Sequence, residues 1–310
     1  MFRRTGLGLD ICADGLRAVA VQNRRRKIVL TGGQILKFSD GVLRPSTRTP
    51  NVHNTELFLA ALRDVLLPIA HKEERVALSL PDGCGYTFLV NVDTPLKSRN
   101  QSIDILKWQL KELLPDSFRD FALDYQVLSE LESGVKRVLV SVIDNAVLAQ
   151  YEDLVEEAGF HAKLIDFHSF QLYNCYRSKT DLGTDFMLVA VSGHELILLG
   201  FQGTMLSSFR VKTVGRSAEA VFREINRSLV SSRSDQAAYS RKKVYLHSDW
   251  DAPDELTDAV RSAFDTDVLI LPDPLAQIRS GVQTLAVSDR ETASMAAALG
   301  AAERLIEKVL

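Results

Sequence analysis

The sequence contains only three cysteines, Cys12, Cys84 and Cys175. They are odd in number and far apart, so we expect no disulfide framework and a reducing compartment as the natural setting. The cysteines lack C-x-x-C spacing and the six histidines lack H-x-x-x-H spacing, so the sequence predicts no zinc site. His161 and His168 flank a predicted strand, and we interpret both as packing or surface residues.

Long apolar runs and an excess of basic charge are also missing. No window approaches the roughly 18–20 apolar residues of a membrane span, and the start of the chain has no apolar core of signal-peptide length. We therefore expect a soluble protein that reaches a membrane only through a partner or a surface patch. The net charge of −3 gives no indication of nucleic acid, because a duplex-binding protein needs a basic face.

The first part of the chain reads as a mixed α/β unit. Runs rich in Leu, Ile and Val predict three strands at 5–11, 16–21 and 27–36. A helix follows, capped by Asn54 and ended by Pro68. Another strand comes next, so strands and helices alternate as in an α/β fold.

A smaller unit of about sixty residues interrupts this pattern. It reads as a strand at 86–93, a helix at 101–114 and two strands at 121–130 and 136–144. Residues 185–211 then predict three more strands with tight turns, as at the start of the chain. The repeat is one of topology and indicates two similar lobes.

Four stretches of this sequence carry a resemblance to the PilM family of type IV pilus assembly proteins, relatives of the divisome protein FtsA. GLDICADGLRAVAV resembles the first phosphate loop of the family, and LKWQLKELLPDSFRDFALDYQVL resembles its insert helix and the Leu-Asp-Tyr segment that follows. SVIDNAVLAQYEDLVEEAGFHAKLIDFHSFQL is similar to the helix and strand that return to the first lobe, and MAAALGAAERLI resembles the closing helix.

This resemblance implies an α/β fold of the actin-like (ribonuclease H-like) class with two lobes. The first lobe is expected over 1–180, with a strand–helix–strand–strand (SHS2) insert at about 84–160. The second lobe is expected over 181–310, and its closing helix is expected to return to the first lobe.

The resemblance also implies a cytoplasmic adaptor or scaffold at the inner membrane, in a type IV pilus or type II secretion-like assembly. Its partner is expected to be the cytoplasmic N-terminal peptide of a PilN-like membrane protein, together with other components of that assembly. Two alternatives stay open, namely a nucleotide-binding ATPase or small-molecule kinase, and a filament-forming actin relative.

The resemblance places a nucleotide site at the first hairpin. Asp10 stands where the family has its acid and Arg17 where it has its basic residue, and Ala13 and Asp14 form the turn between them. Cys12 replaces a glycine that would let the backbone approach a phosphate. Asp10 is the candidate magnesium ligand. The alternatives are that Asp10 is a structural carboxylate at the end of a strand and that Cys12 is a small buried hydrophobic residue.

The second hairpin departs further from the family pattern. Ala190 replaces the second acid and Ser192 replaces a glycine, followed by Gly193. Near the expected adenosine position, Ser248 and Trp250 stand where the family has glycines. Ser192, Gly193 and Ser248 complete the candidate nucleotide contacts, but we expect no ATP hydrolysis and assign no catalytic residue, because phosphoryl transfer depends on those positions. ATP and magnesium thus remain doubtful cofactors.

Overall fold

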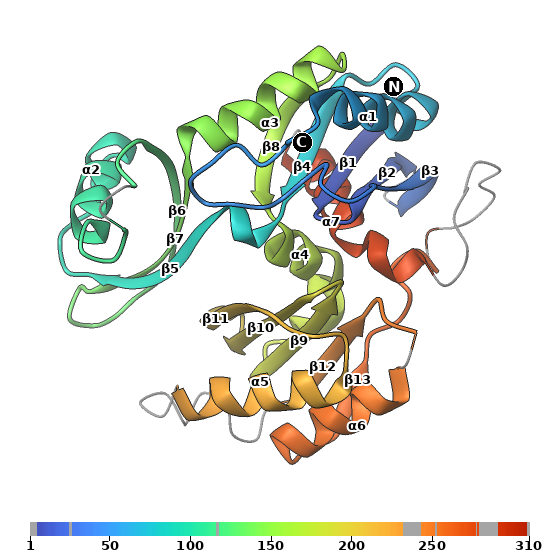
Figure 1. Cartoon of the computed structure of the whole chain (residues 1–310). Helices are drawn as coiled ribbons and strands as arrows, with labels where there is room; N and C mark the ends of the chain where they lie inside the picture. Colours follow the sequence, from blue (N-terminus) through green and yellow to red (C-terminus); the bar gives the residue numbers. More distant parts are fainter. Residues whose placement is uncertain are drawn as a thin grey trace.

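The computed structural model in Figure 1 describes residues 5–24, 27–115, 118–231, 243–251, 253–276, 278 and 291–308. Its α-helices are α1 (Thr55–Ala70), α2 (Arg99–Leu110), α3 (Asn145–Glu157), α4 (His168–Thr180), α5 (Ala218–Ser231), α6 (Pro253–Phe264) and α7 (Ala296–Lys308). Among the described helices, none has both the length and the apolar character needed to cross a membrane.

The first lobe is built on a five-stranded sheet with the order β3-β2-β1-β4-β8. Its strands are β1 (Thr5–Cys12), β2 (Gly15–Arg24), β3 (Lys27–Lys37), β4 (Arg75–Leu80) and β8 (His161–Phe167). Leu7 and Leu9 of β1 pack into the core with α1 and α3. Gly8 and Asp10 lie on the opposite face, because successive residues of a strand alternate between faces.

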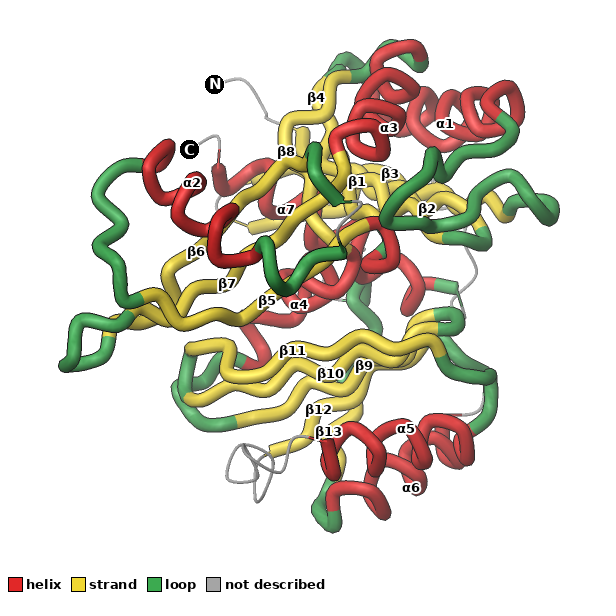
Figure 2. The backbone as a smooth tube through the Cα atoms, turned by 60° about the vertical axis from the view of Figure 1, so that its left-hand side comes forward, coloured by secondary structure: helices red, strands yellow, loops and turns green. Residues whose placement is uncertain are grey.

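The second lobe repeats this topology with the order β11-β10-β9-β12-β13. Its strands are β9 (Phe186–Ser192), β10 (Glu195–Gln202), β11 (Met205–Thr213), β12 (Lys243–Ser248) and β13 (Val268–Ile270). Val189 and Val191 pack on α5 and α6, whereas Leu188 and Ala190 face the core that contains α4 and α7. Figure 2 shows α4 and α7 between the two larger sheets, and this layer joins the lobes.

Small residues let α7 lie directly on β1. A side chain at Gly6 or Gly8 would overlap the backbone carbonyl oxygens of Ala302 and Ala298 in α7. A side chain at Gly300 would in turn overlap the backbone of α4. The glycines of the first strand therefore have a packing role that is independent of any phosphate.

The insert is a three-stranded antiparallel sheet with the order β5-β7-β6, where β5 spans Gly85–Val92, β6 Phe121–Glu130 and β7 Lys136–Asp144. Leu106 and Leu110 of α2 pack on one face of this sheet, while Trp108 on the outer side of α2 is 79% exposed. The helix was predicted to run to 114 but ends at Leu110, because the residues before Pro115 form turns rather than helix.

Two predicted boundaries differ from the structure. Pro68 lies inside α1 and does not end it, since the buried residues Ile69 and Ala70 hold the last turn against the core. The predicted insert at about 84–160 included α3, but Val147 and Tyr151 of α3 pack into the core of the first lobe. The last strand of the insert thus ends at Asp144, and the division of the lobes near residue 180 stays a prediction.

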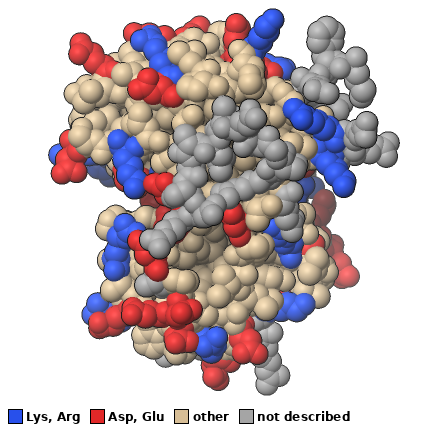
Figure 3. Space-filling view, turned by 90° about the vertical axis from the view of Figure 1, so that its right-hand side faces the viewer, with Lys and Arg blue, Asp and Glu red and all other residues tan. Residues whose placement is uncertain are grey.

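Charged side chains of both signs are interspersed on the face of the molecule drawn in Figure 3. On the face drawn in Figure 3, Lys and Arg lie among Asp and Glu over the described part of both lobes. This distribution agrees with the small net charge of the chain.

Candidate functional site

The first hairpin holds its basic residue by an internal ion pair. Arg17 donates from both terminal nitrogens to the two carboxylate oxygens of Asp14, each over 3.0 Å. Arg17 is buried, whereas Ala13 and Asp14 are exposed at the turn. Burial lowers the pKa of Arg17, but the acidic groups around it outweigh burial and leave the pKa raised. The guanidinium is therefore a fixed positive charge already paired within its own turn.

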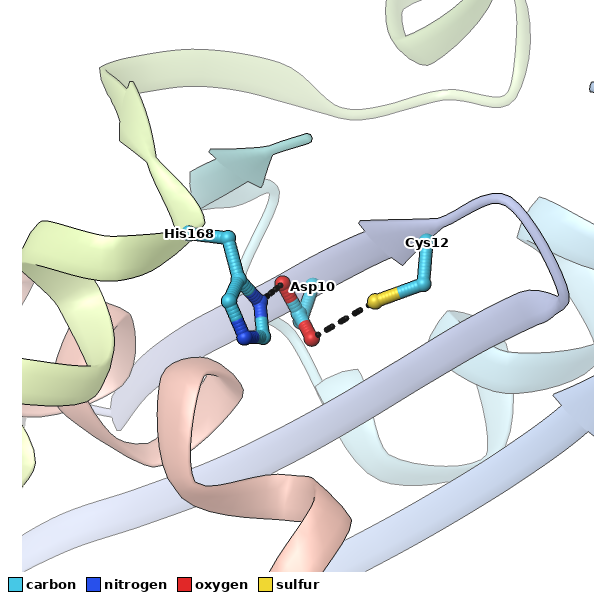
Figure 4. Close-up of side chains that lie close together, drawn as sticks. All are labelled: Asp10, Cys12 and His168. Atoms are coloured by element: carbon cyan, nitrogen blue, oxygen red, sulfur yellow. Dashed lines mark hydrogen bonds and ion pairs between the residues drawn. The ribbon is translucent and has the colours of Figure 1, made fainter. Parts of the chain in front are cut away.

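Asp10 lies at the end of β1 with both carboxylate oxygens engaged. Its Oδ1 accepts from Ser79 Oγ of β4 at 2.5 Å and lies 2.9 Å from Nδ1 of His168 at the start of α4. Its Oδ2 accepts from the Cys12 thiol at 3.1 Å. Figure 4 shows the three side chains of Asp10, Cys12 and His168 converging from β1 and α4. The carboxylate thus ties β1, β4 and α4 together.

The electrostatics of this cluster make Asp10 and His168 a buried ion pair. Burial raises the pKa of Asp10, but the charge and hydrogen bond of His168 outweigh it, so the pKa lies below its ordinary value. Burial lowers the pKa of His168, yet Asp10 outweighs it in turn and raises this pKa well above its ordinary value. Burial raises the pKa of Cys12 to about 12, so at neutral pH in this arrangement Cys12 is a thiol.

The second hairpin is closed by an acid from its own lobe. Gly193 N donates to both carboxylate oxygens of Asp249, at 3.1 and 3.0 Å, and Ser192 Oγ donates to the same carboxylate at 3.4 Å. Trp250 Nε1 donates to Gly193 O at 2.9 Å, and Trp250 N donates to Ser248 Oγ at 3.0 Å. Asp249 therefore occupies the backbone donor of this turn, which is where an actin-like hairpin would offer a hydrogen bond to a phosphate.

A further pair of acids lies in the space between the lobes. Asp82 follows β4 and accepts from the backbone N and the hydroxyl of Ser169, at 3.0 and 2.6 Å, in the first turn of α4. Burial and the nearby Glu195 of β10 raise the pKa of Asp82 to about 7. Burial likewise raises the pKa of Glu195. Because the two acids come from opposite lobes, the electrostatic interaction between the lobes depends on pH.

The two hairpins face each other across this space. Burial raises the pKa of Asp249, and the positive charges of Arg17 and His168 act on it in the opposite direction. The structure thus brings the first set of predicted residues (Asp10, Cys12 and Arg17) within electrostatic reach of the second hairpin. Their role in binding a nucleotide stays a prediction.

Solved structures match this architecture, although no protein-family model and no curated protein matches the sequence. The structure of the PilM–PilN type IV pilus biogenesis complex has a TM-score of 0.79 at 15% identity, over 96% of this chain and 98% of that chain. A Bacteroides thetaiotaomicron protein of unknown function, described as having an actin-like ATPase fold, has a TM-score of 0.51 at 14% identity, over 86% and 90% of the two chains. This chain has the actin-like fold.

The predicted two-lobed fold and the resemblance to PilM are thereby confirmed at the level of the fold. A third similar structure is the cytoplasmic domain of EpsL, an inner-membrane component of the type II secretion system of Vibrio cholerae. It has a TM-score of 0.52 at 10% identity, over 96% of this chain and 95% of that chain. The same lobes and layers thus occur in proteins named for pilus and secretion assemblies.

The residues of this actin-like chain do not fit a magnesium nucleotide. Ala190 offers no oxygen ligand where an acid is expected and is fully buried. The Gly193 N–H is taken by Asp249, and both oxygens of Asp10 are taken by protein donors. Mg²⁺ requires several oxygen ligands, and phosphates require free backbone donors. Among the described residues, Ala190 supplies no ligand, and Asp10 and the Gly193 N–H are already hydrogen-bonded to protein groups.

The sequence analysis missed His168, Ser79, Asp82 and Asp249. We interpreted His168 as a packing or surface residue, but it is 3% exposed and bonded to Asp10. One available signal was position, because β1, β4 and β8 are parallel neighbours and their carboxyl ends meet at one edge of the sheet. Asp10, Asp82 and His168 each lie at or just after one of these ends.

Proposed function

We propose that this protein is a cytoplasmic adaptor at the inner membrane, in a type IV pilus or type II secretion-like assembly. It binds the cytoplasmic N-terminal peptide of a PilN-like membrane protein and connects that protein to other components of the assembly. The observation that carries the proposal is an open groove next to the insert, on a fold similar to that of a PilM–PilN complex. The protein needs no hydrolysis of ATP for this role.

The groove has a volume of about 970 Å³ and is lined by both lobes and the insert. Its lining includes β6 and β7 of the insert, β8 and α4 of the first lobe, β10 of the second lobe, and α7. Tyr173 and Phe201 stack at 4.6 Å along one side, and Phe170 lies near them. These aromatic rings suit the apolar side chains of a bound peptide.

The backbone of β6 supports an extended peptide as the occupant. β6 is an edge strand of the insert sheet, and consecutive residues of it from Ala122 to Gln126 line the groove. An edge strand offers backbone donors and acceptors to which another strand can add. A peptide that pairs with β6 would place alternate side chains against the aromatic wall of α4.

The groove also carries an acid that a basic peptide residue would satisfy. Glu303 of α7 lines the groove, and burial together with the neighbouring Glu307 raises its pKa to about 7. A lysine or arginine of the peptide would favour the ionised form of Glu303, so binding is expected to release a proton near neutral pH. The partner peptide is therefore expected to be apolar with at least one basic residue.

Calorimetry with two ligands tests the proposal. The purified protein is titrated with a synthetic N-terminal peptide of the candidate membrane partner and, separately, with ATP and Mg²⁺. We expect saturable binding of the peptide and no saturable binding of the nucleotide. Binding of the nucleotide without binding of the peptide would overturn the adaptor in favour of a nucleotide-binding actin relative.

Two variants of β6 make a matched pair. Leu128 lines the groove, whereas Val127 is exposed and is not part of the lining. Leu128→Asp is expected to weaken binding of the peptide by about tenfold or more, the loss of one apolar anchor. Val127→Asp places the same charge on the same strand and is expected to leave binding unchanged. An equal loss of peptide affinity in both variants would contradict binding of the peptide in this groove.

A further inference from the structure

Three side chains with different metal-binding atoms meet at the end of β1. The Asp10 carboxylate, the Cys12 thiol and the His168 imidazole each offer one ligand atom, and these atoms all lie within 4.8 Å of one another. Two of the separations are 2.9 Å, between Asp10 Oδ1 and His168 Nδ1, and 3.1 Å, between Asp10 Oδ2 and Cys12 Sγ. Figure 4 shows the Asp10 carboxylate between the other two groups, with one oxygen toward His168 and the other toward Cys12.

These separations are close to those of a tetrahedral metal site. Zinc lies about 2.0–2.3 Å from its nitrogen, oxygen and sulfur ligands, so neighbouring ligand atoms around it stand roughly 3.3–3.8 Å apart. The two separations from Asp10 are shorter than this, so the Cys12 and His168 side chains would move slightly apart to hold an ion. An ion at the centre would replace the two hydrogen bonds to Asp10 by bonds to the metal.

The set of donor atoms selects the metal. A thiolate with an imidazole and a single carboxylate favours Zn²⁺ over Mg²⁺ or Ca²⁺, which prefer oxygen ligands alone. The thiolate and carboxylate together carry two negative charges, which balance a divalent cation. Three protein ligands leave a fourth tetrahedral position for water.

The surroundings of the cluster also suit an ion. The Ser79 hydroxyl donates to Asp10 at 2.5 Å and orients the carboxylate, as neighbours of metal ligands commonly do. Cys12 is partly exposed beside the exposed turn, which gives a path of entry. His168 faces Asp10 with its Nδ1, and its buried Nε2 has no hydrogen-bond partner among the described residues, so no second protein contact fixes the imidazole ring.

We propose that Asp10, Cys12 and His168 form a binding site for a thiophilic divalent cation, with Zn²⁺ as the expected occupant. The site stands where the actin-like fold places its first phosphate hairpin, and the residue that replaces the glycine there supplies the thiolate. A bound ion would join β1 to the first turn of α4. Since α4 leads directly into the second lobe, the ion would hold the connection between the lobes.

Titration with Co²⁺, followed by its displacement with Zn²⁺, tests this site on the full chain after treatment with a chelator. Thiolate-bound Co²⁺ gives a charge-transfer absorption in the near ultraviolet, so the titration reports a metal bonded to sulfur. We expect one Co²⁺ per chain with this absorption, and complete displacement by one equivalent of Zn²⁺. A folded protein without the absorption would overturn the proposal, whatever the variants do.

Two serine variants locate the sulfur. Cys12→Ser keeps a donor to Asp10 but is a poor zinc ligand, so the affinity for Zn²⁺ is expected to fall by at least about 100-fold, beyond the range for residues that only orient a ligand. Cys84→Ser is the control, because Cys84 Sγ donates to Asn51 Oδ1 at 2.8 Å and a hydroxyl can do the same. Cys84→Ser is expected to bind Zn²⁺ as the unaltered protein does. Equal affinity in both variants would rule out Cys12 as a ligand.

Thermal unfolding provides a second readout. An ion that binds only the folded chain raises the midpoint of unfolding as its concentration rises. Zn²⁺ is expected to raise the midpoint of the unaltered protein and of Cys84→Ser, but not that of Cys12→Ser. A shift that is the same in all three proteins would indicate zinc bound elsewhere and would count against the site.

Discussion

His168 is the partner that allows Asp10 to be buried as an anion, so its removal is a direct test of the site. Asp10 is fully buried and His168 is 3% exposed, which leaves little screening by solvent. Removing one partner of a buried pair costs about 3–5 kcal/mol, because the other charge is left without compensation. Ser79 and Cys12 still donate to Asp10, so we predict that His168→Ala lowers the free energy of unfolding by about 3 kcal/mol, the low end of that range.

The pH dependence of this loss follows from the directions of the two pKa shifts. The pKa of His168 is raised above its ordinary value of 6.5, so its contribution to stability is complete below that pH and declines as pH rises through the folded value. The pKa of Asp10 is lowered from 3.8, so its contribution is complete above that pH and declines as pH falls toward the folded value. The difference in the free energy of unfolding between the unaltered protein and His168→Ala is therefore expected to be largest between pH 3.8 and pH 6.5 and smaller at alkaline pH.

Urea unfolding in buffer with EDTA measures this effect, because the chelator leaves only the contacts between protein groups. A double-mutant cycle with Asp10→Asn should give a coupling energy at the upper end of the roughly 0.5–3 kcal/mol found for residues in contact. His53→Ala is the control, since His53 is exposed, and it should change stability by less than about 0.5 kcal/mol. A loss of less than about 1 kcal/mol in His168→Ala, well under the cost of breaking a buried pair, together with additive effects in the cycle, would refute the buried ion pair.

Two further predictions concern the contact of α7 with β1 and the acids between the lobes. Gly8→Ala should destabilise the protein by about 3 kcal/mol or more, the top of the range for overpacking, because its side chain would overlap the Ala298 carbonyl. Thermal unfolding measures this effect, with Gly215→Ala as the control because the carbon added there has ordinary contacts. Equal unfolding midpoints for the two variants would contradict the prediction. Burial and Glu195 raise the pKa of Asp82 from 3.8 to about 7, so the folded protein holds this proton longer and stability should fall as pH rises between these values. Asp82→Asn should flatten that fall in urea titrations at several pH values, whereas parallel curves would show that Asp82 does not titrate in this range.

The sequence predicted the elements of the fold well where the signal was periodic and local. The strands of both meanders and of the insert were placed within a few residues, because apolar runs bounded by turn residues mark strands. The helix ends at Pro68 and near residue 114 were misjudged, since burial of Ile69 and the turns before Pro115 decide them. The contact of Ile69 is tertiary and leaves no local pattern, whereas the turns after Leu110 are local backbone hydrogen bonds.

The candidate site was harder to predict because its contacts join distant parts of the chain. Asp10 and His168 are separated by 158 residues, and Gly193 and Asp249 by 56. The sequence showed that Cys12 and Ala190 depart from a phosphate-binding pattern, but it could not show which groups replace the phosphate. Regular spacing of metal ligands reports ligands on one helix or turn, so a cluster formed by β1 and α4 leaves no such pattern in the sequence.

The backbone shape of the first hairpin has a structural role that does not depend on binding a phosphate. Gly6 and Gly8 are kept small by the backbone of α7, so the glycine-rich first strand is required by packing even where no phosphate binds. Asp249 supplies a carboxylate to the Gly193 donor, which satisfies the second hairpin without a nucleotide. The two lobes also share a buried core that contains α4 and α7, so packing joins them independently of a nucleotide. The proposed binding of a partner in the groove beside the insert therefore does not depend on a nucleotide between the lobes.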